Sequence, residues 1–401
     1  MKIYGKTISD IFFEMPWQYK IVMLAGISFF PIIFLNTCAG VTKLTAPQEP
    51  APTHISRTAS NAHIYDPSIA SDGERTHLMA FTYLTNDGTM EGLWQPGVLL
   101  ASSANGCKSW TPIGNERILA PKAAEIMAPD GQSMIDGGVW RYETPSVVYD
   151  PDDEGREWKL FSYRYFWSVK NGLAATRRYG FITYQETSDI YGEWSTEVWL
   201  MSPAPDYPPP PYQDMVLHHI NTLHDSLKDV RMYSRPSVVY IDKALVMSLS
   251  AFTDKETPDR VVMLASFDHG RHWKYMGTPL RAEDVTKIGP YTRFGGASLL
   301  VSGEQLYLAA VLGDDETGGG GTFIFTFHDA ASGQLMRDDD SVPVLHKTIP
   351  LSSEKVTTVG GGYAAWSDDC ESGVVTAEYS GIKNRFLLFD THEFIGIRDK
   401  K

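Results

Sequence analysis

The segment ETPSVVYDPDDEGREWKLFSYRYF, residues 143–166, decides the fold, because its plan recurs along the chain. A proline is followed by a β-branched apolar strand, a polar turn and a second apolar strand. Residues 66–84 (DPSIASDGERTHLMAFTYL) and 235–252 (RPSVVYIDKALVMSLSAF) repeat this plan closely. Residues 295–313 keep it without the proline, and residues 361–380 are the most divergent copy. Self-similarity of this kind is typical of repeat architectures.

Each copy is followed by a further β-rich stretch bounded by turn residues, which predicts a third strand. These stretches are GVLLASS (97–103), FITYQETS (181–188), VVMLASFD (261–268), TFIFTFHD (322–329) and RFLLFDT (385–391). The copies lie far enough apart for four strands each. We therefore predict an all-β fold, a five-bladed β-propeller of four-stranded antiparallel blades over residues 61–401. Helix-period patterning is weak in this region, with residues 122–128 (KAAEIMA) as one helical candidate.

A turn at residues 266–273 (SFDHGRHW) has the serine, aspartate, glycine and tryptophan spacing of an Asp box. The aspartate caps backbone amides, the glycine tolerates a left-handed conformation, and the tryptophan packs between blades. Degenerate copies at 103–110 and 187–194 carry Cys107 and Tyr191 in the glycine place. We interpret these turns as structural.

The N-terminal region reads as an export signal. Lysines precede an apolar run at residues 21–35, which is shorter than the roughly 20 residues of a spanning helix and suits a signal peptide. Leu35, three residues before Cys38, resembles a bacterial lipobox, although the intervening pair is atypical. We expect a lipoprotein-type signal over 1–38 with lipidation at Cys38, a flexible tether over 39–60, and an exported, membrane-anchored domain in the cell envelope. The alternative is an ordinary signal peptide or an uncleaved anchor.

Charge and cysteine content restrict the partners and the cross-links. The formal net charge of −14 argues against a nucleic-acid partner, since phosphate binding needs a basic surface. Cys107 and Cys370 fall in the first and last repeats, where a disulfide would close the ring. Spacing alone cannot establish the required geometry, so we expect two unpaired thiols.

The entrance of each inner strand supplies the candidate site. In a propeller the innermost strands border the central channel, so the residues at their entrances face one cavity. We assign these positions to Asp66, Glu143, Arg235, Gly296 and Tyr363. Two carboxylates and an arginine would then converge where three consecutive blades meet the channel.

Three short motifs resemble a group of five-bladed glycoside hydrolases. They are DPSI at 66–69, PSVVYD at 145–150 and YQETSDIYGEW at 184–194. The group includes family 43 arabinanases and xylosidases and family 32 invertase-like enzymes, while the Asp-box pattern resembles sialidases. The resemblance covers most of the chain after residue 61, as short motifs only. It implies a carbohydrate substrate and no cofactor.

The resemblance also assigns roles. Asp66 stands where family 43 has its general base, and Glu143 where an aspartate tunes the acid and holds the sugar. Arg235 stands where the family has a glutamate as general acid, and a guanidinium cannot donate a proton at neutral pH. Either Glu143 is the acid with Asp66 as base or nucleophile, or the site binds sugar without cleaving it, or a loop supplies the acid. The loop candidates are Asp87, Glu91, Asp254, Glu256, Asp314, Asp315 and Glu316.

Further residues near the strand entrances are candidates for substrate binding. Arginines bind carboxylates in bidentate fashion, which would suit an acidic sugar, although they could instead neutralise the nearby carboxylates. Aromatic rings could stack on sugars or pack between blades. The candidates are Arg141, Arg235, Arg293, Tyr65, Tyr142, Trp167 and Tyr363. Residues 218–225 (HHINTLHD) contain three histidines without ligand periodicity, so we expect no metal site.

Overall fold

The computed structural model of the chain describes residues 2–3, 6–7, 54–55, 63–74, 76–85, 95–114, 118–128, 133–168, 176–205, 212–253, 257–314, 318–349, 356–357, 364–379 and 383–390. The chain divides into two units, Met1–Glu49 and Pro50–Lys401. In the first unit, β1 (Lys2–Ile3) pairs with β2 (Lys6–Thr7). The apolar run at 21–35 and Cys38 lie outside the described residues. Within the described ranges, none of the helices has the length and apolar character needed to cross a membrane.

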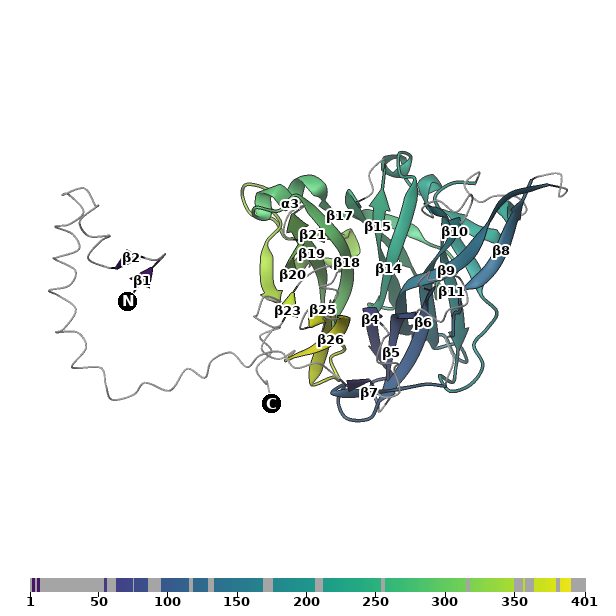
Figure 1. The fold of residues 1–401 in the computed structure, drawn as a ribbon, viewed down its shortest axis with the longest axis horizontal. Coiled ribbons are helices and arrows are strands. Elements are labelled where there is room, and N and C mark those ends of the chain that lie inside the picture. Colours follow the sequence, from purple (N-terminus) through teal and green to yellow (C-terminus); the bar gives the residue numbers. More distant parts are fainter. Residues whose placement is uncertain are drawn as a thin grey trace. The chain divides into compact units, whose positions relative to one another are not determined.

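The second unit is built from antiparallel sheets (Figure 1). The first contains β4 (His63–Ser71), β5 (His77–Thr85), β6 (Gln95–Ser103) and β7 (Ser109–Pro112), with β3 (His54–Ile55) parallel to β7. The second contains β9 (Met134–Tyr149), β10 (Trp158–Ser168), β11 (Thr176–Thr187) and β12 (Val198–Ser202), with β8 (Lys122–Met127) beyond β9 and β13 (Val216–His219) parallel to β12. The third contains β14 (Met232–Ile241), β15 (Ala244–Phe252), β16 (Arg260–Ser266) and β17 (Lys274–Arg281).

The fourth sheet contains β18 (Arg293–Ser302), β19 (Gln305–Asp314) and β20 (Gly318–Asp329), and both β21 (Gln334–Leu335) and β22 (Leu345–Ile349) pair with β20. In the last sheet, β23 (Val356–Thr357), β24 (Ala364–Ala365) and β26 (Lys383–Asp390) pair with β25 (Ser372–Tyr379). A short helix, α3 (Ala282–Ile288), follows β17, and 3-10 turns occur at Gln213–Met215, Ile220–Thr222, Asp225–Leu227 and Ala330–Ser332.

The inner strands form a closed circuit. Strand β4 contacts β9, β9 contacts β14, β14 contacts β18, β18 contacts β24, and β24 returns to β4. In Figure 1 the purple β4 accordingly lies beside the yellow β25 and β26. The unit is therefore an all-β propeller of antiparallel sheets, as the repeats predict. Apolar residues fill the space between neighbouring sheets, for example Trp158 and Leu100 between the first and second.

Serine side chains link the inner strands around this circuit. Ser68 Oγ accepts a hydrogen bond from the Val147 N–H at 3.0 Å, and Ser146 Oγ accepts one from the Val238 N–H at 2.8 Å. Ser237 Oγ accepts from the Leu299 N–H at 2.8 Å, and Ser298 Oγ donates to the Ala364 carbonyl at 3.0 Å. Each serine directly follows the repeat's proline or alanine. Within the described ranges, no ladder pairs the inner strands of different blades, so these serines supply polar contacts between them.

The turn at 266–273 is held by its own side chains. Ser266 Oγ accepts from the Gly270 N–H at 2.8 Å, and Asp268 Oδ1 accepts from the His272 N–H at 2.9 Å. Gly270 has φ +90°, and the buried Trp273 packs in the cluster between the second and third sheets. The related turn at 103–110 has Cys107 in the glycine place with φ +69°.

Two expectations are corrected here. Residues 122–127 form β8 and not a helix, because they pair along the free edge of the long β9. Cys107 and Cys370 are not separate thiols: they form a disulfide with a Cα–Cα distance of 5.4 Å. The closed circuit brings together two residues separated by 263 positions, which sequence spacing could not reveal.

Candidate functional site at the mouth of the central cavity

Three inner strands share an unusual backbone conformation at one position. Asp66, Thr144 and Arg235 each directly precede the repeat's proline, and their φ angles are +52°, +51° and +56°. Each lies within a register shift of the strand pairing, as at a β-bulge. A left-handed conformation is costly for a residue with a Cβ, and a bulge redirects its side chain. The fourth inner strand has a shorter register shift, between Phe294 and Gly296, where the skipped residue is Gly295.

These three residues line one cavity of about 350 Å³. Its wall comes from the inner strands β4, β9, β14 and β18 and from residues 364–369. This volume is at the lower end of the range of small-molecule sites. Neighbouring inner strands run in step, because Ser68 bonds to Val147 and Ser146 bonds to Val238. Asp66, Thr144 and Arg235 each begin a lining segment, so they lie at the same end of the cavity, which we call its mouth.

Asp66 is held within this mouth by a threonine. Its side chain is buried, and its Oδ2 accepts a hydrogen bond from Thr82 Oγ1 at 3.1 Å. Thr82 Oγ1 in turn accepts the N–H of Thr144 at 2.9 Å. The Thr82 hydroxyl on β5 therefore hydrogen-bonds both to the Asp66 carboxylate and to the backbone of Thr144 in the next blade.

Arg235 extends toward the next blade. Its Nη1 donates to the carbonyl of Gly295, at the bulge of β18. The side chain is half-buried and forms part of the cavity wall. The arginine predicted at the mouth therefore lies there, and it links the third blade to the fourth.

Glu143 does not occupy the position equivalent to Asp66 and Arg235. Thr144 does, so our alignment of the second blade is one residue out of register. Glu143 is half-buried and is not part of the cavity wall, although it is adjacent to Thr144 in the chain. Its Oε1 accepts a hydrogen bond from Tyr165 OH at 2.5 Å. Tyr165 stacks on Tyr163, with ring centroids 5.3 Å apart.

Arg141 on β9 and Trp167 on β10 lie together, and neither is part of the cavity wall. The Arg141 guanidinium lies 4.3 Å from the centre of the Trp167 ring. Arg141 is only 5% exposed, and its Nε and Nη2 atoms are buried without a hydrogen-bond partner among the described residues. A guanidinium in this state has unused capacity to bind an anion.

No protein-family model matches the chain, and no curated protein matches it. Among solved structures, a complex of BT0996 with RGII is 13% identical with a TM-score of 0.50, over 84% of this protein and 90% of that one. Native Bacillus subtilis arabinanase is 11% identical, with a TM-score of 0.47, over 83% and 96%. A putative glycosidase from Bacteroides thetaiotaomicron is 12% identical, with a TM-score of 0.46, over 82% and 87%. The protein therefore resembles the BT0996 structure in fold. At these identities the likeness concerns the fold.

Tyr142 lies in the packing between blades. It is buried among the first and second sheets, and its hydroxyl donates to Glu197 Oε2 at 3.0 Å. Glu197 also pairs with Arg164 at 2.7 Å, and the Arg164 guanidinium lies over the rings of Trp140 and Trp199. Burial raises the pKa of Tyr142, and the Glu197 carboxylate adds to this effect. Burial also raises the pKa of Glu197, against the opposing charge of Arg164.

The remaining candidates are dispersed. Tyr65 precedes Asp66 on β4 and is half-buried, and Arg293, also half-buried, begins β18. Tyr363 lies outside the described residues, as do the loop acids Asp87, Glu91, Asp254, Glu256, Asp315 and Glu316 and the side chain of Asp314.

The histidines of residues 218–225 make separate hydrogen bonds. His218 contacts the Arg271 carbonyl at 2.7 Å, His219 contacts Ser202 Oγ at 2.9 Å, and His224 contacts Ser226 Oγ at 2.8 Å. Each imidazole therefore holds a different part of the long connection between the second and third sheets.

Sequence reasoning missed two residues that position the candidate carboxylates, Thr82 and Tyr165. Thr82 carried a usable signal, because it is a hydroxyl residue within the mainly apolar stretch LMAFTYL. Tyr165 carried none, since tyrosines are ordinary residues in a packed strand.

Proposed function

We propose that the chain is a glycoside hydrolase-like propeller with five blades, acting on an oligosaccharide at the mouth of its central cavity. The proposal rests mainly on one observation. At the β-bulge of three inner strands, Asp66, Thr144 and Arg235 have positive φ angles, and all three line the mouth of the same cavity. Backbone strain of this kind concentrates where function requires it. The fifth blade is inferred from residues 364–369, which line the cavity beside the other four inner strands.

Asp66 acts in this proposal as general base or nucleophile. Its carboxylate is buried, borders the cavity, and is oriented by Thr82 before any substrate arrives, which lowers the cost of reaching a reactive geometry. Glu143 acts as the acid or as the residue that tunes it, since it adjoins the cavity wall and is the nearest carboxylate in the chain to Thr144. A pair of carboxyl groups is the usual requirement for glycoside hydrolysis.

The substrate is proposed to carry a carboxylate. Arg141 is a buried cation whose Nε and Nη2 have no hydrogen-bond partner in the described part of the chain, and Trp167 beside it offers a flat aromatic face. Burying a charge without a partner is costly, so a ligand anion would stabilise this arrangement. A uronic or sialic acid combines such an anion with a ring that can stack.

The test is hydrolysis of a panel of neutral and acidic oligosaccharides by the wild type, Asp66→Asn and Glu143→Gln. Loss of general acid–base chemistry is expected to lower the rate by about 100-fold or more in each variant. Arg141→Met is expected to weaken only the acidic substrates, with neutral ones as the internal control. Full activity in both carboxylate variants would exclude this site.

A non-catalytic, carbohydrate-binding propeller is the second candidate. It is favoured by Arg235, which stands where the resembling enzymes carry their acid, and by Glu143, which is not part of the cavity wall. Calorimetry separates the two candidates: a glycan that binds and stays intact over prolonged incubation supports binding alone.

We further propose that residues 1–38 are a lipoprotein signal and that Cys38 carries the lipid, which would hold the propeller in the cell envelope by the tether 39–60. Metabolic labelling with a fatty acid tests this. Label should enter the wild type and be absent from Cys38→Ser, which should also leave the membrane fraction.

A further inference from the structure

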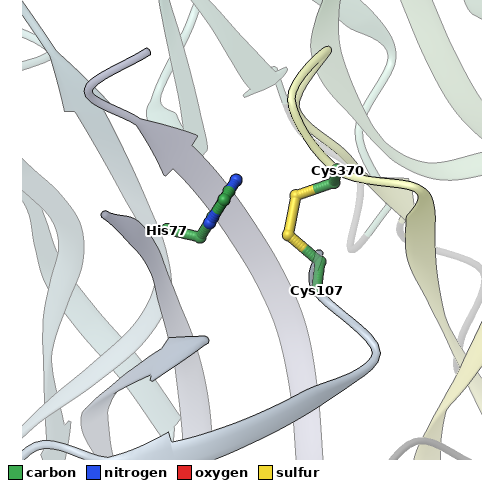
Figure 2. A group of neighbouring side chains, drawn as sticks. All are labelled: His77, Cys107 and Cys370. Carbon is green, nitrogen blue, oxygen red and sulfur yellow. A yellow bond between two sulfur atoms is a disulfide. The ribbon is translucent and has the colours of Figure 1, made fainter. Parts of the chain in front are cut away.

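The disulfide between the first and last sheets has a histidine beside it. Cys107 lies in the turn between β6 and β7, Cys370 lies two residues before β25, and His77 begins β5. One nitrogen of His77 and the two sulfur atoms lie within 4.8 Å of one another. Figure 2 shows the imidazole approaching the disulfide from the side of β5. Three segments that are distant in sequence therefore bring together an imidazole and two sulfurs.

The His77 ring is chemically unsatisfied. Both ring nitrogens are buried, and neither has a hydrogen-bond partner within the described residues. Its surroundings are apolar, because Met79, Trp110 and Val374 belong to the same cluster as the cysteines. Buried polar groups normally find partners, so two orphan nitrogens beside two sulfurs suggest a ligand set.

We propose that His77, Cys107 and Cys370 bind one Zn²⁺ ion when the disulfide is reduced. Two thiolates and one imidazole are a donor set that zinc favours, with water in the fourth position. Bonds of about 2.3 Å to sulfur and 2.0 Å to nitrogen place ligand atoms roughly 3.5 Å apart. The two sulfurs must therefore move apart once their bond is broken, to a spacing within the 4.8 Å that already contains all three ligand atoms. Two thiolates neutralise the ion, and a neutral complex suits this apolar site.

Reduction and metal binding are consecutive steps. A dithiol reductant supplies two electrons and two protons, so the S–S bond becomes two thiols while the dithiol is oxidised to its own disulfide. Zinc then binds the sulfurs and releases the two thiol protons. The disulfide and the zinc complex exclude each other, because both use the same sulfur atoms.

The site has a short route to solvent. Both sulfurs are buried, but the flanking Lys108 and Glu371 are exposed and form an ion pair across the two segments. An exposed ion pair contributes little stability, so this contact presents only a small barrier to access from solvent.

Cobalt titration of the full-length protein tests the proposal, in a Cys38→Ser background so that only two cysteines remain. After reduction by a phosphine and its removal, Co²⁺ should give thiolate charge-transfer and tetrahedral d–d bands at one equivalent, and Zn²⁺ should displace it. The oxidised protein should give neither band. Cys107→Ser should abolish the bands, and His77→Ala should weaken binding by at least about tenfold.

The matched control is His272→Ala, which removes an exposed imidazole elsewhere and should leave the titration unchanged. Near-ultraviolet circular dichroism of each reduced variant checks that it is folded. Absence of cobalt bands in reduced, folded protein overturns the proposal, as do equal bands in the oxidised protein or in His77→Ala.

Discussion

The hydroxyl of Ser146 on β9 accepts a hydrogen bond from the backbone N–H of Val238 on β14, at 2.8 Å. The two strands belong to different sheets, and Ser237 makes the same contact to Leu299 one sheet further on. Because Val238 and Ser146 are buried, removing the hydroxyl leaves a backbone donor without its partner. An unsatisfied buried donor costs about 1–3 kcal/mol.

We therefore expect Ser146→Ala to lower the free energy of unfolding by about 1–3 kcal/mol. Ser248→Ala is the matched control, since Ser248 is equally buried but its hydroxyl has no partner in the described part of the protein. Urea denaturation measures both. Equal effects of the two substitutions would contradict a role for serine in joining the blades.

Thr82→Val should uncouple the two sides of the cavity mouth. Valine has the shape of threonine but offers no oxygen to the Thr144 N–H and no proton to Asp66. Stability should fall by about 1–3 kcal/mol. Glycan binding or hydrolysis should weaken as well, because the Asp66 carboxylate loses the group that orients it.

A double-mutant cycle with Asp66→Asn checks that relationship. Residues in one hydrogen-bond network are typically coupled by about 0.5–3 kcal/mol, whereas independent residues are additive. Additive effects of Thr82→Val and Asp66→Asn on unfolding would show that the contact does not orient the carboxylate.

Lys159 should be among the most sensitive charged residues of the propeller. It is fully buried and its Nζ lies 2.6 Å from Asp153. Lys159→Met removes the ammonium group that neutralises the buried Asp153 carboxylate. Breaking a buried ion pair typically lowers the free energy of unfolding by about 3–5 kcal/mol. Lys228→Met is the control, because Lys228 and Asp225 are both exposed and their ion pair should contribute nothing measurable. Thermal unfolding that responds equally to the two substitutions would refute this distinction.

Asp268 should make the fold sensitive to acid. Burial raises the pKa of this carboxyl, but hydrogen bonds from His272 and Ser266 outweigh burial and lower the pKa to about 2. The unfolded value is about 3.9, so the stabilisation is fully present above that pH and disappears as the pH falls toward 2. Asp268→Asn, which cannot titrate, should flatten the loss of unfolding free energy between these values. An unchanged pH slope would contradict the assignment.

The repeat predicted the inner strands correctly because Pro67, Pro145 and Pro236 mark the same point in three blades. The serine after each proline was visible in the sequence too, but its hydrogen bond to the next blade was not, since that contact depends on the placement of neighbouring sheets. The fifth repeat was the hardest to recognise in the sequence, because residues 361–380 lack the proline and share few residues with the other copies.

The site was only partly predictable. Glu143 was aligned with Asp66 because it is acidic, yet Thr144 is the residue that directly precedes Pro145, as Asp66 precedes Pro67. The proline spacing therefore located the equivalent position, and the preference for a carboxylate displaced it by one residue. The buried Tyr142–Glu197 contact was equally hidden, because it joins residues 55 positions apart on different strands.

The cross-link between Cys107 and Cys370 turns the intervening polypeptide into a covalent loop. A protease that cuts any exposed connection inside this loop opens one peptide bond without detaching a fragment. The nicked protein stays a single molecule until the sulfur bridge is reduced, and only then do its pieces separate. Under the export proposed above, integrity against secreted proteases would depend on the redox state of the protein's surroundings.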